Sequence, residues 1–395
     1  MILSEANKLR ILYFLVFCCT ASWLPIFADY LKDRGLSGIE IGFVLSITPV
    51  MMFIVQPFYG MAADTFGYKK CLLLSSLLAG VSYCLYFIDT GFVGLVITTI
   101  IMSLFYNSLQ PLLDSLSLKL AQENPSFSYG TLRVAGAAGW AFTGIIAGHY
   151  IDTINTSVIF AISAISMLLL FVFSMTLAPD LKNLQSTVQR KKTSVGGVLA
   201  NKQLIFLLLA VLLISIGATT IWNFYSIYMK ENGASASLVG YGLSFQGLCE
   251  LPFFYFSARI ILKFGLRTTL MVTVVATALR LFLYSVTGNP KLAILIELLH
   301  GISWSLFWVV CVEYVNLLVP EDWRATGQSL LYAAYFGAGA ILGNLWTGFL
   351  YDAQMKMATI FLLNAGIVSI VAVLIFFFVG KPRVGRCRIK SITSG

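Results

Sequence analysis

Two charged residues and a tryptophan lie in apolar stretches of this chain. Asp114 is inside one such stretch, and Arg133 and Trp140 belong to the next one. A guanidinium can hold a carboxylate or a pair of hydroxyls through two hydrogen bonds, and an indole face can stack on the apolar face of a sugar, a base or a benzene ring. We therefore expect Asp114, Arg133 and Trp140 to form one wall of a binding site for a small polar solute.

The stretch around Asp114 carries further polar side chains at helical spacing. Four of them fall at intervals of four, three and four residues and so share one helix face: Ser103, Asn107, Gln110 and Asp114. Amides beside a carboxylate suit a hydrated cavity, so we predict that Asn107 and Gln110 also contact the solute. The alternative is a polar seam that hydrogen-bonds to a neighbouring helix.

A second group of ionisable residues occurs later in the chain. Its members are Glu250, with Gln246 one turn earlier, then Arg280, Glu297 and His300. Burial favours the neutral form of a carboxylate and a nearby cation favours the ionised form, and this competition lets a carboxylate exchange protons near neutral pH. We predict a proton-coupling role for Glu297, His300, Arg280 and Glu250, and solute contacts for Glu250 and Gln246. A static buried ion cluster is the alternative.

The composition indicates which elements must position these residues. The chain is 58% hydrophobic and 11% charged, against roughly 45–50% and about 25% for a soluble domain. This is typical of an all-α integral membrane protein, in which a buried charge marks a substrate or ion pathway. Apolar runs of about 20 residues predict twelve transmembrane helices. They are 11–31, 38–62, 70–88, 91–121, 131–152, 156–178, 203–229, 236–262, 267–287, 291–318, 325–351 and 356–380.

The loops predict the domain organisation and the topology. One long polar connection, 179–202, separates an N-terminal six-helix bundle (1–178) from a C-terminal one (203–380), and a basic tail (381–395) follows. Lys and Arg are concentrated in the loops on the side of the termini and of this linker. The positive-inside rule therefore places both termini and the linker in the cytoplasm of a multi-pass plasma (inner) membrane protein. The net charge of +9 reflects this distribution.

The second half of the chain repeats the first. The segment Tyr30–Gly38 returns as Tyr228–Ala236, and Gly139, Gly148 and Asp152 return as Gly339, Gly348 and Asp352. The two offsets, 198 and 200 residues, are nearly equal, as expected when the two halves are copies of one repeat. Repeats in the same orientation predict two six-helix bundles related by a pseudo-two-fold axis along the membrane normal.

The loop between the second and third predicted helices carries a recognisable pattern. Its residues Gly60, Asp64, Gly67, Lys69 and Lys70 resemble the GxxxD loop signature of the major facilitator superfamily, with Thr65 and Tyr68 where basic residues are usual. The resemblance implies a gating loop in which the glycines allow close helix approach and Asp64 accepts hydrogen bonds from a helix N-terminus. The counterpart loop keeps Gly265 but has no acid, so we expect the first half to anchor the gate.

Other motifs resemble one branch of that superfamily, the phenylpropionate permeases and the oligosaccharide:proton symporters of the lactose permease type. The motifs are Leu24-Pro25, Leu31-Lys32 with Gly35, Pro111 with Asp114, Tyr129-Gly130, Arg133 with Gly136, Glu250, Arg280 and Leu299-His300. The resemblance implies that Asp114, Arg133 and Trp140 bind the sugar. It also implies that Glu250, Arg280 and His300 serve sugar binding and proton coupling. Ser303 stands where the branch has its proton-carrying glutamate, so Glu297 is the expected replacement.

Together these observations predict a proton-coupled importer of a sugar-like solute that works by alternating access. The alternatives are a transporter of an aromatic acid or a nucleoside, a proton-driven exporter, and a receptor that binds solute without moving it. Two histidines and seven cysteines without CxxC spacing offer no triad or metal site, so we expect no enzymatic activity, no metal and no cofactor besides H+. The expected partners are a small-molecule solute and the lipid bilayer, with no nucleic acid, and the expected state is a monomer.

Overall fold

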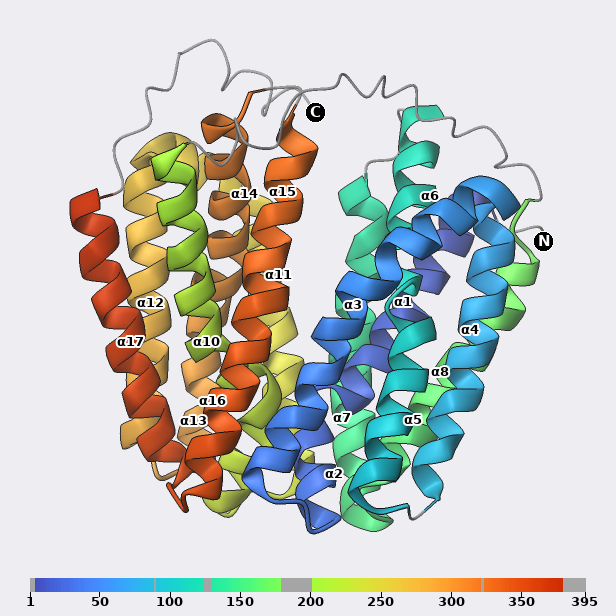
Figure 1. The fold of residues 1–395 in the computed structure, drawn as a ribbon, viewed down its shortest axis with the longest axis horizontal. Coiled ribbons are helices and arrows are strands. Elements are labelled where there is room, and N and C mark those ends of the chain that lie inside the picture. The colour runs from blue at the N-terminus through green and yellow to red at the C-terminus, as the bar shows by residue number, and fades with distance from the viewer. Residues whose placement is uncertain (1–3, 89, 124–128, 179–200, 321–322, 379–395) are drawn as a thin grey trace. The chain divides into compact units, whose positions relative to one another are not determined.

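The computed structural model describes residues 4–378 except 89, 124–128, 179–200 and 321–322 (Figure 1). Every regular element in these residues is a helix, and ten helical segments are long and apolar enough to cross a membrane. The two other predicted spans, the segments 236–264 and 324–352, are also helical but more polar. The predicted all-α, twelve-helix membrane fold is therefore confirmed.

The helices match the predicted spans to within a few residues. In chain order they are α1 (Glu5–Trp23), α2 (Phe27–Asp33), α3 (Gly38–Phe66), α4 (Tyr68–Cys84), α5 (Gly91–Tyr106), α6 (Leu109–Glu123), α7 (Tyr129–Thr153), α8 (Val158–Met175), α10 (Lys202–Glu231), α11 (Ala236–Phe264), α12 (Leu266–Val286), α13 (Pro290–Ile296), α14 (Phe307–Leu318), α15 (Arg324–Tyr332), α16 (Ala340–Asp352) and α17 (Met357–Phe378). Short segments of other helix types are η1 (Leu85–Phe87), η2 (Glu297–Leu299), η3 (Gly301–Leu306) and η5 (Ala333–Gly339).

Several predicted spans are interrupted rather than continuous. The first breaks between α1 and α2, next to Pro25, and the fourth breaks at Asn107, because Pro111 has no N–H to donate to the Asn107 carbonyl. The tenth contains a 3₁₀ turn, η2, and a π-helical turn, η3, and the eleventh contains the π-helical segment η5. Such π segments often occur at functional sites.

The described chain forms two compact units. One contains α1 to α8 together with Trp222–Gly247, and the other contains the first part of α10, up to Ile221, and the chain from Leu248 onward. The units therefore divide α10 and α11, whereas the sequence assigns both helices wholly to the second bundle. The division into 1–178 and 203–380 remains a prediction.

The core of the first unit is aromatic. Trp23, Phe27 and Tyr86 are almost fully buried, and the ring of Tyr86 stacks on Phe160 with centroids 4.1 Å apart. The rings of Phe27 and Tyr86 are nearly perpendicular with centroids 5.6 Å apart, and those of Trp23 and Phe27 are also steeply inclined, with centroids 5.3 Å apart. These contacts tie α1, α2 and α8 into one packed body that can hold polar side chains at fixed positions.

The predicted repeat is confirmed in the backbone. Gly35 and Gly233 have φ of 78° and 82°, and Gly67 and Gly265 have φ of 92° and 80°. L-residues rarely adopt positive φ, so each turn requires glycine. Both pairs are separated by the same 198 residues that separate the repeated loops.

A basic residue follows two positions after Gly67 and after Gly265, and each of these basic residues has the same role in its unit. Lys69 donates to the carbonyl oxygens of Met175, at 2.8 Å, and Leu177, at the end of α8. Arg267 donates to the carbonyl oxygen of Phe376, near the end of α17. A cation at a helix C-terminus satisfies free carbonyls and complements the helix dipole.

The other residues of the predicted gating loop have fewer contacts than Lys69. Asp64 is exposed and accepts a 3.4 Å hydrogen bond from the Tyr68 hydroxyl, and Lys70 is exposed. No described atom lies within 4 Å of a Cβ built on Gly60. Within its own unit the α3 surface at Gly60 has no described neighbour, so close helix approach at Gly60 remains a prediction.

Replacing Gly67 by Ala is expected to destabilise the protein by about 1–3 kcal/mol, since its φ of 92° and ψ of 147° suit glycine alone. Gly60→Ala is the matched control in the same helix. It meets open space and is expected to be neutral or to stabilise by about 0.5–1 kcal/mol. Thermal unfolding in detergent measures both variants, and equal melting temperatures for the two would contradict the expectation.

Candidate functional site

Asp114 and Arg133, on α6 and α7, both contact side chains of α1. The hydroxyl of Tyr13 donates to Asp114 Oδ1 at 2.7 Å, and the guanidinium carbon of Arg133 lies 5.9 Å from the centre of the Phe17 ring. Tyr13 and Phe17 are four residues apart and therefore share a face of α1. Both charged side chains are half-buried, so polar groups of a solute can reach them.

Glycines of α7 bring α1 close enough for these contacts. A Cβ on Gly136 would lie 2.6 Å from the Phe17 ring, and one on Gly139 would lie 2.3 Å from the Phe14 carbonyl oxygen. Small residues let membrane helices approach backbone to backbone. Nothing in the sequence singles out Tyr13 or Phe17.

Two of the remaining residues on the predicted polar face, Ser103 and Asn107, contact Thr48 of α3. The Asn107 side-chain amide donates to the Thr48 carbonyl oxygen at 3.0 Å, and the Ser103 hydroxyl lies 3.0 Å from the Thr48 hydroxyl. These contacts with α3 match the alternative of a seam against a neighbouring helix. Gln110 is half-buried. Solute contacts by Asn107 and Gln110 remain predictions.

Trp140 packs against the chain segment that belongs to the first unit, Trp222–Gly247. Its indole N–H donates to the Leu243 carbonyl oxygen at 3.2 Å, and its ring meets Trp222 edge-on with centroids 6.4 Å apart. A Cβ on Gly247 would lie 3.1 Å from the indole. Gln246, the neighbouring predicted solute contact, is buried.

Close contacts continue from Trp140 along α7 and the start of α11. A Cβ on Gly240 would lie 2.1 Å from the Gly144 carbonyl oxygen, and one on Gly148 would lie 2.5 Å from that of Ala236. The Ser244 hydroxyl donates to the Ala141 carbonyl oxygen at 2.6 Å. We call this set the α7–α11 contact.

Asp152 lies at the end of the α7–α11 contact that is farther from Trp140. Its carboxylate accepts from the backbone N–H groups of Ala236 and Ser237, both at 2.8 Å, and from the Ser237 hydroxyl at 2.5 Å. An acidic residue at a helix N-terminus satisfies free N–H groups and complements the positive end of the dipole. Asp152 therefore caps α11 from another helix.

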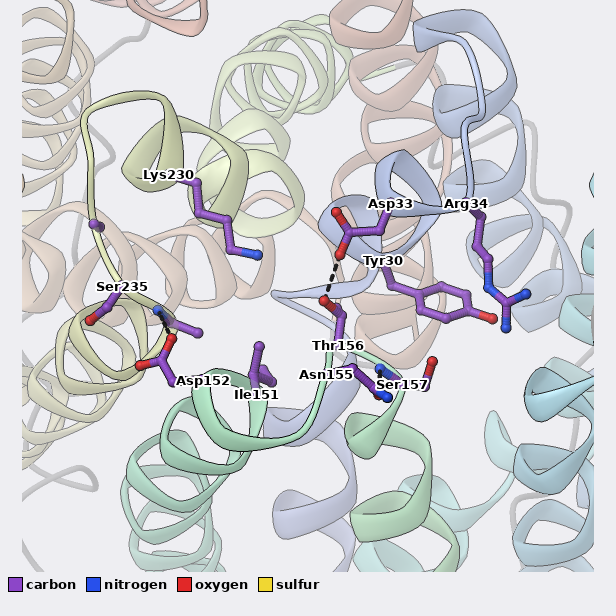
Figure 2. A pocket seen from close by; sticks show the side chains of 12 residues that line it. Tyr30, Asp33, Arg34, Ile151, Asp152, Asn155, Thr156, Ser157, Lys230 and Ser235 are labelled. Carbon is purple, nitrogen blue, oxygen red and sulfur yellow. Dashed lines mark hydrogen bonds between the residues drawn. The ribbon is translucent and has the colours of Figure 1, made fainter.

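A polar cavity of about 540 Å³ lies beside this cap (Figure 2). Lys230 lines it and forms an ion pair with Asp29, whose side chain is only 3% exposed. Asp33 also lines it and accepts from the Thr156 hydroxyl at 2.5 Å. The cavity and the ion pair lie where the repeated loops of the first unit meet α7.

The ionisable residues of the second unit form one connected chain of contacts. Glu250 Oε1 lies 2.8 Å from His300 Nε2, and His300 Nδ1 lies 2.7 Å from an Arg280 guanidinium nitrogen. Arg280 also forms an ion pair with Glu297, which accepts from the Tyr284 hydroxyl. The structure therefore brings together all four residues that the sequence singled out in this unit.

The contacts of His300 determine its tautomer. A guanidinium can only donate hydrogen bonds, so Nδ1 of His300 accepts from Arg280 and carries no proton. The single imidazole proton then resides on Nε2 and is donated to Glu250. His300 is neutral in this arrangement and links a carboxylate to a cation.

Burial differs sharply along this chain of contacts. The side chains of Arg280, Glu297 and His300 are at most 4% exposed, whereas that of Glu250 is 23% exposed. Breaking a buried ion pair by removing one partner costs about 3–5 kcal/mol. Glu297 is therefore held in place by Arg280 and Tyr284, while Glu250 is accessible from outside the cluster.

Local backbone features position His300. It precedes the π-helical turn η3, and a Cβ on Gly301 would lie 2.3 Å from the Cys249 carbonyl oxygen. Gly301 thus allows this turn to approach the backbone of α11 next to Glu250. Tyr284 was missed by the sequence reasoning, although it lies one helical turn after Arg280 on the same face.

Comparisons with known proteins agree with this architecture. The family model described as "MFS_1 like family" matches residues 6–363. The "Maltose permease" of Geobacillus stearothermophilus is 26% identical over 93% of this chain and 93% of the relative. The "Probable 3-phenylpropionic acid transporter" of Escherichia coli (strain K12) is 24% identical over 89% and 93%. The crystal structure of the nucleoside transporter NupG has the same fold, with a TM-score of 0.83 at 20% identity over 95% and 99% of the two chains.

Proposed function

Because this chain belongs to the MFS_1 like family and is a multi-pass major facilitator transporter, we propose that it imports a small polar organic solute, sugar or sugar-like, together with protons. The observation that carries this proposal is the chain of contacts from Glu250 through His300 and Arg280 to Glu297. It links the charge of an accessible carboxylate to that of a buried one, and ionisable groups placed like this inside a membrane protein mark substrate or ion pathways.

Arg280 limits proton transfer within this cluster. A guanidinium does not release its proton, so a proton cannot hop through Arg280 from His300 to Glu297. The two carboxylates are instead coupled electrostatically, because Arg280 pairs with Glu297 directly and with Glu250 through His300. Protonation of Glu297 or Glu250 weakens its attraction to Arg280, and this change favours solute binding by Asp114, Arg133 and Trp140.

The residues of the first unit support a sugar-like solute. The half-buried Asp114 and Arg133 offer an acceptor and a planar set of donors, which suit neighbouring hydroxyls. Trp140 lies two turns along α7 from Arg133. An aromatic acid or a nucleoside could use the same arginine and indole, so these solutes are the alternatives, as are export and solute binding without transport.

We assign the α7–α11 contact as the closure of one entrance in alternating access. The contact, its Asp152 cap and the neighbouring Lys230–Asp29 ion pair have to separate when that entrance opens. The positive-inside rule places this entrance on the outer face of the plasma (inner) membrane, with both termini cytoplasmic. The transporter acts as a monomer, with H+ as coupling ion and no other cofactor.

Replacing Asp152 by Ala is expected to favour the state in which α11 has separated from α7. The variant loses three hydrogen bonds, and loss of a helix cap costs about 0.5–2 kcal/mol, which corresponds to roughly two- to thirtyfold in population. Asp152→Asn keeps an acceptor and should behave almost as the parent. The measurement is maleimide labelling of a cysteine placed at the buried Leu243 in a cysteine-free background. Identical labelling rates in all three proteins would contradict the assignment.

A thermal-shift screen of purified protein against sugars, nucleosides and aromatic acids tests the solute class. A solute that binds only the native state raises the melting temperature with the logarithm of its concentration. We expect shifts from sugars alone. Counterflow in proteoliposomes with the same solute then separates a transporter from a receptor, which would bind without flux. A shift from nucleosides or aromatic acids alone would replace the sugar assignment.

A further inference from the structure

The turn between α11 and α12 carries three basic side chains at one end of the second unit. Arg259 and Lys263 are four residues apart on α11, and Arg267 follows Gly265 at the start of α12. Arg259 and Lys263 are exposed, and Arg267 is half-buried. Within the described part of the chain, none of the three forms an ion pair with a carboxylate. We call these three residues the basic triad.

Two members of the basic triad have no basic counterpart in the first unit. The repeat offset of 198 residues pairs Arg259 with Met61 and Lys263 with Thr65. The same offset pairs Asp64, the acid of the first-unit turn, with a leucine. The repeated fold therefore forms without these two cations, and their charge is not balanced by an acid in the same turn. A surface of this kind attracts anions from outside the chain.

Each cation of the basic triad lies over an exposed aromatic ring. The distances from the charged groups to the ring centres are 5.3–5.8 Å. The three rings are 42–57% exposed and belong to Phe256, Phe264 and Phe376. Basic side chains near the ends of membrane helices lay their apolar stems along such surfaces and hold the charge at the level of the lipid headgroups. The basic triad therefore has the surroundings of a headgroup site.

The proposed topology determines which leaflet the basic triad faces. Because α11 begins at the outer entrance, beside Asp152, it ends at the cytoplasmic side of the membrane. The cytoplasmic leaflet carries anionic lipids, and each Lys or Arg near its surface strengthens binding about fivefold. The charge of the basic triad therefore complements the leaflet in which it lies.

We propose that the basic triad binds the headgroup phosphate of an anionic phospholipid in the cytoplasmic leaflet. A guanidinium holds a phosphate through two parallel hydrogen bonds, and an ammonium adds a point charge. Arg267 is kept in place by its hydrogen bond to the Phe376 carbonyl oxygen, so a lipid bound here contacts α11, α12 and α17. The site lies apart from the ionisable cluster and requires neither a particular solute nor proton coupling.

Thermal unfolding of the full-length protein in neutral detergent, titrated with dioleoyl phosphatidylglycerol, tests this site. The melting temperature of the parent should rise with the logarithm of lipid concentration. The double variant Arg259→Gln/Lys263→Gln should need about thirtyfold more lipid for the same shift. Both side chains lie over rings of α11 itself, so the melting temperature without lipid should stay unchanged, which shows that the variant is folded.

Two further variants serve as controls. Lys291→Gln/Lys356→Gln removes two exposed lysines from the opposite end of the second unit and should keep the full response to phosphatidylglycerol. Lys263→Arg keeps the charge and should keep the response as well. Dioleoyl phosphatidylcholine has the same chains without net charge and should give a much smaller shift in the parent. Raising NaCl from about 0.1 M to about 1 M should weaken the response to phosphatidylglycerol.

Sodium phosphate and glycerol 3-phosphate separate a free phosphate from a lipid headgroup. Neither should match the shift caused by phosphatidylglycerol, and an equal shift from either would overturn the assignment to lipid. Equal responses of the parent and the Arg259→Gln/Lys263→Gln variant would remove the basic triad from the site. So would an equal loss of response in Lys291→Gln/Lys356→Gln, or equal shifts from the two phospholipids in the parent. No solute is present in these titrations, so their outcome is independent of the proposed transport function.

Discussion

Glu297→Gln is expected to abolish accumulation of solute against its gradient while exchange of solute across the membrane continues. Glutamine has nearly the shape of a protonated glutamic acid, so Arg280 and Tyr284 keep a neighbour of the right size. The variant cannot ionise, however, and so cannot alternate between a paired and a neutral state. Coupling to the proton gradient is lost, whereas the movement that exchanges bound solute is retained.

Uptake into energised proteoliposomes and counterflow without a gradient measure the two activities separately. Glu313→Gln is the matched control, because Glu313 is a half-buried glutamate of the same span that has no part in the cluster. It should retain both activities. Full accumulation by Glu297→Gln would show that Glu297 is not the coupling carboxylate, and Glu250→Gln would then be the variant to lose accumulation.

Arg133→Ala is expected to weaken solute binding by at least tenfold and to reduce counterflow to background. Hydrogen bonds to charged groups contribute about 1.5–3 kcal/mol, and each 1.4 kcal/mol corresponds to a factor of ten. Lysine cannot reproduce the planar set of donors, so Arg133→Lys should recover little. Phe17 and Tyr13 remain in place, and the packing of α1 on α7 depends mainly on glycines.

Arg10→Ala provides the control for Arg133. Arg10 is a half-buried arginine of the first unit that donates to the Thr131 carbonyl oxygen at 3.4 Å. Its loss should leave solute affinity within about twofold, since weak surface interactions contribute little. Undiminished counterflow by Arg133→Ala would remove this residue, and with it the assigned wall, from the solute site.

The fold was largely predictable because the bilayer imposes simple rules on sequence. Apolar length predicted each span to within a few residues, and the equal spacing of Gly35 to Gly233 and Gly67 to Gly265 followed from turns that only glycine can form. The ionisable cluster was also predictable as a group. Buried charges need partners, so Glu250, Arg280, Glu297 and His300 had to meet something polar.

Other features depend on packing that sequence spacing does not reveal. Tyr13 and Phe17 lie in an apolar run and become neighbours of Asp114 and Arg133 only because α7 glycines admit α1. Asn107 shares a helical face with Asp114 in the sequence, yet the break caused by Pro111 leaves it against Thr48. The π turns η3 and η5 change the helical period itself, so a constant spacing could not place the side chains that follow them.

Proton movement coupled to solute entry tests the central claim most directly. Proteoliposomes containing a pH-sensitive dye, with no imposed gradient, receive the sugar identified by the thermal-shift screen. Symport predicts acidification of the lumen that requires both the sugar and the protein, and that disappears in Glu297→Gln while counterflow of labelled sugar persists. Entry of labelled sugar into the parent proteoliposomes without any change in lumenal pH would contradict the account.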